Sequence, residues 1–80
     1  MKVRVYGPGC MKCDTLVELV TRAAGESGHS CDIEKVTDLG EIISAGIITT
    51  PGLEIDGEVI LQGKVPSLEK LVAILDAHAT

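Results

Sequence analysis

The chain has 80 residues, which is enough for one domain near the lower size limit for a single hydrophobic core. Seven basic and twelve acidic residues give a net charge of −5, which argues against a nucleic-acid surface. No apolar run reaches the roughly 18 residues that a membrane span needs. Apolar residues make up 45% of the chain and include a single aromatic, Tyr6, so we expect an aliphatic core.

The first elements follow from periodicity. Residues 2–6 alternate and predict a strand, which residues 7–9 (GPG) break. Residues 11–27 predict a helix that ends at Gly28. Its apolar stripe consists of Cys13, Leu16, Val17, Val20 and Ala24. Residues 30–36 predict a second strand.

A short helix and a hairpin come next. Asp38 is the expected cap of the helix, and Gly46 closes it. Residues 52–55 and 58–62 predict two strands around Asp56-Gly57, the strongest short signal for a two-residue hairpin turn. The hairpin strands are therefore antiparallel.

The chain then closes with a helix that follows Gly63 and is capped by Ser67. Its buried stripe is Leu68, Leu71, Val72 and Leu75. The order β-α-β-α-β-β-α predicts an α/β fold with a four-stranded mixed sheet and helices on both faces. The first strand is expected to be central, so it delivers residues 7–13 to the sheet edge where sites gather.

Cys10 and Cys13 stand at the start of the first predicted helix. Unpaired backbone N–H groups and the helix dipole stabilise a thiolate there, so we expect a lowered pKa for Cys10. Lys12 adds a nearby cation. Cys13 follows one turn later on the apolar stripe, so it should be more buried and less reactive. In this division Cys10 attacks a substrate disulfide and Cys13 resolves the mixed disulfide.

Four segments, taken in order, resemble the small redox-active disulfide proteins of the thioredoxin-like, glutaredoxin-like family. They are residues 6–13 (YGPGCMKC), 49–51 (TTP), 55–57 (IDG) and 63–67 (GKVPS). The match covers nearly the whole chain. The resemblance implies a single thioredoxin-like domain over residues 1–80 and a thiol–disulfide oxidoreductase that reduces protein or small-molecule disulfides.

The resemblance also implies roles for particular residues. Pro51 would be the cis-proline that faces the disulfide, and Thr50 would offer its backbone to an extended substrate segment. Cys10 and Cys13 would be the nucleophilic and resolving cysteines. The resemblance implies an upstream disulfide reductase and target disulfide proteins as partners.

Three further residues complete the expected substrate-binding set. Met11 and Lys12 lie between the cysteines, where they would shape the recognition surface and tune the choice of partner. Tyr6 either lines the disulfide pocket or only packs at the end of the first strand, and the sequence leaves both interpretations open.

An alternative function is a soft-metal (Cu/Zn) binding or metallochaperone module that uses the same cysteine pair, since Cu(I) prefers thiolates. Domains of that kind carry Met two residues before the first cysteine, where this chain has Pro8. A zinc site that adds His29 and Cys31 is disfavoured, because both follow the far end of a helix roughly 22 Å long. A second alternative is a non-catalytic binding domain with the same fold.

The N-terminal stretch MKVRVYGPGC lacks the unbroken apolar segment of a signal peptide, so we expect a cytoplasmic protein. Three cysteines in a reducing compartment do not form a static disulfide framework, and a paired motif there indicates redox or metal chemistry. We expect a monomer, because the predicted sheet needs no partner to complete it, and we expect no cofactor.

Overall fold

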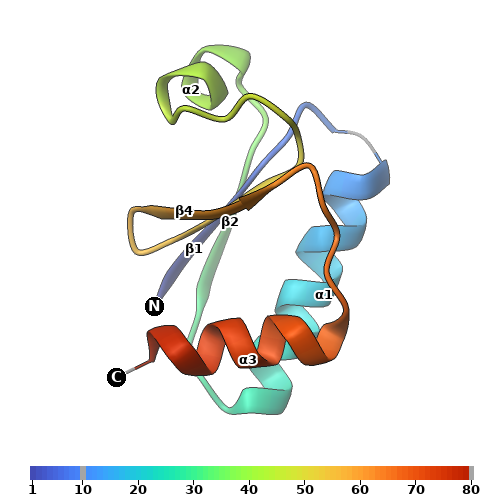
Figure 1. Ribbon diagram of the computed structural model, residues 1–80, viewed down its shortest axis with the longest axis vertical. Coiled ribbons are helices and arrows are strands. Elements are labelled where there is room, and N and C mark those ends of the chain that lie inside the picture. Colours follow the sequence, from blue (N-terminus) through green and yellow to red (C-terminus); the bar gives the residue numbers. More distant parts are fainter. Residues whose placement is uncertain (10, 80) are drawn as a thin grey trace.

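The structure is a computed structural model that describes residues 1–9 and 11–79 (Figure 1). Its elements are β1 (Lys2–Tyr6), α1 (Met11–Ser27), β2 (Asp32–Val36), α2 (Leu39–Ser44), β3 (Gly52–Ile55), β4 (Glu58–Gln62) and α3 (Leu68–His78). The predicted element order is confirmed. None of the helices in these two ranges is long and apolar enough to cross a bilayer.

The four strands form one sheet in the order β2-β1-β3-β4. β1 pairs with β2 in parallel and with β3 in antiparallel orientation, and β3 and β4 form an antiparallel hairpin. The sheet is therefore mixed, and β1 lies inside it as predicted. The carboxyl end of β1 reaches the edge of the sheet from which the chain passes to α1.

α1 and α3 lie side by side on one face of the sheet (Figure 1). Alternation along β1 turns Val3 and Val5 towards these helices, and both valines are fully buried. The main core cluster is aliphatic throughout and consists of Val3, Val5, Leu16, Val20, Ala23, Ala24, Leu53, Ile55, Leu71 and Leu75. The predicted helical stripes are thus the surfaces that pack on the sheet.

α2 covers the opposite face of the sheet from α1 and α3 (Figure 1). A second cluster forms there from Tyr6, Val36, Ile42 and Ile47. α2 has only six residues, so a single side of it meets the sheet. Ile42 occupies that side, whereas Leu39 and Ile43 point into solvent.

Local signals in the sequence produce the turns and caps that were predicted. Asp56 and Gly57 have φ values of 48° and 87°, the positive values that a primed hairpin turn requires. The Asp56 carboxylate also accepts a hydrogen bond from the Lys2 N–H at 2.7 Å, which ties the hairpin to β1. Ser67 caps α3, and its Oγ accepts from the Lys70 N–H at 3.2 Å.

β2 begins at Asp32, two residues later than the alternation predicted. β1 begins at Lys2, which pairs with Asp32, and before this pair only Met1 lies beside the chain: its carbonyl accepts from the Asp32 N–H at 2.9 Å, and its amino group donates to the Ser30 carbonyl at 3.1 Å. Cys31 therefore precedes the strand. It is a half-buried free thiol that packs against the main core cluster.

Candidate functional site

A short turn carries the chain from the end of β1 to the start of α1. The Gly7 N–H donates to the Val36 carbonyl at 2.9 Å, which extends the parallel pairing one residue beyond β1. Pro8 and Gly9 are exposed, and Gly9 has a φ of 96°, which favours glycine. The predicted nucleophile, Cys10, lies outside the described residues.

Cys13 lies in the first turn of α1, on the side that faces the sheet. Its side chain is 0% exposed, and the cysteine is disulfide-bonded. The predicted burial of Cys13 is confirmed, and its role as the resolving cysteine stays a prediction.

Gly7 passes directly over Cys13. A Cβ atom added to Gly7 would lie 2.1 Å from Cys13 Sγ and 2.9 Å from Cys13 Cβ. Side-chain carbons do not approach other atoms so closely, so only glycine lets the end of β1 cross this sulfur. The sequence showed Gly7 as a strand breaker but gave no sign of this contact.

The Thr50–Pro51 peptide bond is cis, the isomer that the resemblance implied. Pro51 is buried and immediately precedes β3. Thr50 Cβ and Cys13 Sγ both lie within 4.0 Å of the position that a Gly7 Cβ would take. The structure therefore brings together the cis-proline segment, the end of β1 and the first turn of α1.

The end of β4 holds the segment that leads to Pro51. Gln62 Oε1 accepts hydrogen bonds from the Ile48 N–H at 2.7 Å and the Thr49 N–H at 3.2 Å. The Gly63 N–H donates to the Pro51 carbonyl at 2.8 Å. Sequence reasoning missed Gln62, whose only signal was a polar side chain at the end of a strand beside a glycine.

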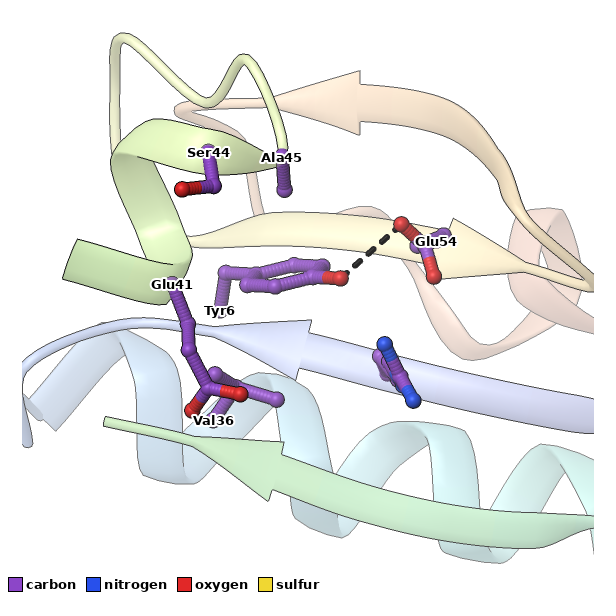
Figure 2. Close-up of a pocket in the computed structure, with 7 residues that line it drawn as sticks. Tyr6, Val36, Glu41, Ser44, Ala45 and Glu54 are labelled. Atoms are coloured by element: carbon purple, nitrogen blue, oxygen red, sulfur yellow. Dashed lines mark hydrogen bonds between the residues drawn. The ribbon is translucent and has the colours of Figure 1, made fainter. Parts of the chain in front are cut away.

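Tyr6 faces the α2 side of the sheet. Figure 2 shows its ring between α2 and β3, with the hydroxyl directed at Glu54. Tyr6 Oη donates to Glu54 Oε2 at 2.9 Å, and the ring belongs to the second cluster. Burial raises the pKa of the Tyr6 hydroxyl above its ordinary value, and the hydrogen bond to Glu54 adds to the rise. These contacts match packing at the strand end, and a substrate role for Tyr6 stays a prediction.

A shallow pocket of about 290 Å³ opens beside Tyr6 (Figure 2). It is lined by Arg4, Tyr6, Val36, Glu41, Ser44, Ala45 and Glu54. Arg4 Nε lies 3.0 Å from Glu34 Oε1 on the neighbouring strand. The pocket is on the α2 face, whereas Gly7 and Cys13 meet on the α1 side.

Met11 and Lys12 begin α1, and both side chains point into solvent. Met11 is 86% exposed, so its thioether and methylenes form an apolar surface beside the cysteine motif. The predicted exposure of Met11 is confirmed, and the recognition roles of both residues stay predictions.

The described residues contain no group of three or more His, Cys, Asp and Glu side chains that could hold a metal ion. His29 Nε2 lies 2.7 Å from Asp76 Oδ1 on α3. Cys31 Sγ lies 4.0 Å from Met1 Sδ. His29 and Cys31 thus have their contacts near the far end of α1 from Cys13.

Comparison with known proteins identifies the family of the chain. A family model described as "Thioredoxin domain" matches residues 1–76. The protein called Thioredoxin in Methanothermobacter thermautotrophicus is 37% identical over 75 residues, which cover 94% of this chain and 97% of the relative. The Thioredoxin of Methanocaldococcus jannaschii is 39% identical over 76 residues, covering 95% of this chain and 87% of the relative.

A third relative, called Probable Thioredoxin in Methanothermobacter marburgensis, is 31% identical, and the match covers 95% of this chain and 94% of the relative. These matches span nearly the whole chain, and a thioredoxin-like α/β fold agrees with the mixed sheet described above. The chain belongs to the thioredoxin domain family, and it is a thiol–disulfide oxidoreductase.

Proposed function

We propose that Cys10 and Cys13 form the redox-active pair of this oxidoreductase and reduce disulfides of proteins or small molecules. The observation that carries the proposal is Cys13, a buried and disulfide-bonded cysteine in the first turn of α1. The cis Thr50–Pro51 segment lies next to Gly7, which crosses Cys13, and forms another side of the proposed site.

The reaction is two successive thiol–disulfide exchanges. The Cys10 thiolate attacks one sulfur of the target disulfide, whose S–S bond breaks, and the departing thiolate takes up a proton. The Cys13 thiolate then attacks Cys10 Sγ in the mixed disulfide. A Cys10–Cys13 disulfide forms, and the second target sulfur leaves as a thiolate and is protonated. The target gains two electrons and two protons, and this protein's dithiol loses them.

Recognition is assigned to the surface around the first turn of α1. The backbone of Thr50 pairs with an extended target segment in the manner of an added strand. Met11 and Lys12 contact the residues that flank the target disulfide, since both are exposed at the start of α1. Tyr6 packs at the end of β1, next to this surface, and is given no contact with the target here.

The electron supply comes from an upstream disulfide reductase that returns the oxidised pair to the dithiol. The partners are that reductase and target disulfide proteins, with neither nucleic acid nor membrane involved. We assign the protein to the cytoplasm, where thiols are kept reduced, and we expect it to act as a monomer.

The proposal is tested by dithiothreitol-dependent insulin reduction with three cysteine variants. Cys10→Ser abolishes turnover, because the attacking sulfur is gone. In a separate incubation of the pre-reduced protein with insulin but without dithiothreitol, Cys13→Ser stops after the first exchange and accumulates a mixed disulfide with the target, visible as a mass adduct that later addition of dithiothreitol removes. Cys31→Ser is the matched control and keeps wild-type turnover, since this free thiol lies beyond the other end of α1.

Two outcomes would contradict the proposal. Wild-type turnover by Cys10→Ser would show that the nucleophile is wrong. Native mass spectrometry would favour the soft-metal alternative if the protein retained stoichiometric copper or zinc and carried out no disulfide exchange.

A further inference from the structure

The side chain of Gln62 accepts hydrogen bonds from two backbone N–H groups that no neighbouring strand among the described residues pairs with. Ile48 and Thr49 lie in the irregular segment between α2 and β3, so their N–H groups face no neighbouring strand in the described sheet. Gln62 Oε1 accepts from both, at 2.7 Å and 3.2 Å. A single amide oxygen has two lone pairs, so one half-buried side chain satisfies two consecutive backbone donors.

Gly63 fixes the same segment from the next position. Its N–H donates to the Pro51 carbonyl at 2.8 Å. Its φ is 71°, and an added Cβ would lie 2.7 Å from Thr49 Cγ2. Gln62 and Gly63 together therefore hold residues 48–51 at three backbone groups and at one side-chain contact.

This arrangement sends three successive side chains in different directions. The Thr49 methyl group faces Gly63, and Thr50 Cβ lies 4.0 Å from the position that a Gly7 Cβ would take. Ile48 is left 91% exposed, the highest value among the exposed large apolar side chains of the described residues. Met11 at 86% is second, so the two most exposed apolar side chains stand on the two segments that form the site.

A solvent-exposed apolar side chain contributes no burial free energy to folding. Its unfavourable hydration is relieved when a partner covers it. The two hydrogen bonds to Gln62 restrict the backbone at Ile48, which lowers the ordering cost when a target protein binds. A small disulfide that contacts only the sulfur atoms gains from neither feature. The difference between the two substrate classes is therefore measurable.

We propose that Gln62 is a positioning residue for protein substrates: it holds residues 48–51 so that Ile48 meets an apolar side chain of the target while the disulfide meets the cysteine pair. The inference rests on the proposed function and adds a substrate preference to it. It assigns Ile48 as the apolar contact and Gln62 as the residue that orients it.

The test compares steady-state reduction of insulin with that of 2-hydroxyethyl disulfide. Gln62→Leu raises KM for insulin about five- to tenfold with kcat unchanged, because two hydrogen bonds that order the segment are lost. Gln62→Glu keeps an acceptor oxygen and stays close to wild type. In Gln62→Leu, kcat/KM for the small disulfide falls by less than kcat/KM for insulin does. Amide hydrogen exchange at Ile48 and Thr49 accelerates in Gln62→Leu and not in Gln62→Glu.

The second arm replaces the exposed apolar residue. Ile48→Ser lowers kcat/KM for insulin about fivefold, and Ile43→Ser is the matched control, since Ile43 is 67% exposed on α2 and should have no effect. Equal losses in the two variants would overturn the assignment of Ile48. Equal losses in Gln62→Leu and Gln62→Glu, or unchanged amide protection in Gln62→Leu, would overturn the role of Gln62. A wild-type protein that reduces neither substrate refutes the proposed function itself, whereas a loss confined to the variants does not.

Discussion

Replacing Gly7 with alanine places a methyl group where Cys13 already lies. The new Cβ would be 2.1 Å from Cys13 Sγ, whereas non-bonded heavy atoms rest about 3.5–4.0 Å apart. One side of the contact must move by about 1.5 Å. β1 is held by Val36 and by its pairing with β3, and Cys13 is fully buried. Neither side has room to yield.

The expected cost follows from overpacking. Extra carbon in a well-packed core typically destabilises by about 1–3 kcal/mol, and the upper end applies because both elements are fixed. Alanine recovers up to about 1 kcal/mol by restricting the unfolded chain. We therefore expect Gly7→Ala to lower the free energy of unfolding by about 2 kcal/mol. For a domain of this size that lowers Tm by about 8–16 °C.

Thermal and urea unfolding, followed by circular dichroism under one redox condition, measure the change. Gly25→Ala is the matched control, since Gly25 lies within α1 and an added Cβ meets nothing within 4 Å. That variant should gain about 0.5–1 kcal/mol because alanine is the better helix former. The reasoning about Gly7 is refuted if both alanine variants unfold at or above the wild-type temperature.

Three further predictions concern other parts of the molecule. Tyr6 is the only tyrosine and there is no tryptophan, so absorbance at 295 nm should report its ionisation alone, at a pH above the ordinary tyrosine range. Because its folded pKa is raised, stability is fully present below the unfolded pKa of about 10 and falls as pH rises through the folded value; Tyr6→Phe removes that loss. Ser67→Ala should cost about 1 kcal/mol in urea unfolding, since the Lys70 N–H loses its cap. Leu16→Ala should cost about 2–5 kcal/mol, since Leu16 is 0% exposed; a cost below 1 kcal/mol would contradict its place in the core.

Much of the architecture was predictable because its signals are local. The alternation in residues 2–6, the helical stripe that contains Cys13 and the Asp56-Gly57 turn each need only neighbouring residues, and the structure contains all three. The order of these elements then restricts the sheet to few topologies, since crossover and hairpin connections obey fixed rules. The central place of β1 follows from those rules.

The details of the site were not predictable in the same way. The contact between Gly7 and Cys13 depends on the angle at which α1 crosses the end of β1, which tertiary packing sets. The bonds from Gln62 to Ile48 and Thr49 join residues 13 and 14 positions apart, without any periodic pattern. The direction of the Tyr6 ring required the position of α2. Such contacts leave no repeating mark in the sequence.

The free thiol of Cys31 offers an experimental handle. About 20 Å of helix separates Cys13 from the end of α1 that Cys31 follows, so a label on Cys31 stays clear of the disulfide. In the proposed scheme an alkylating reagent, added under denaturing conditions because Cys13 is buried in the folded protein, marks one cysteine in the oxidised protein and three in the reduced protein. Each mass spectrum thus carries its own internal standard, and a fluorophore or surface linker attached at Cys31 would leave disulfide exchange intact.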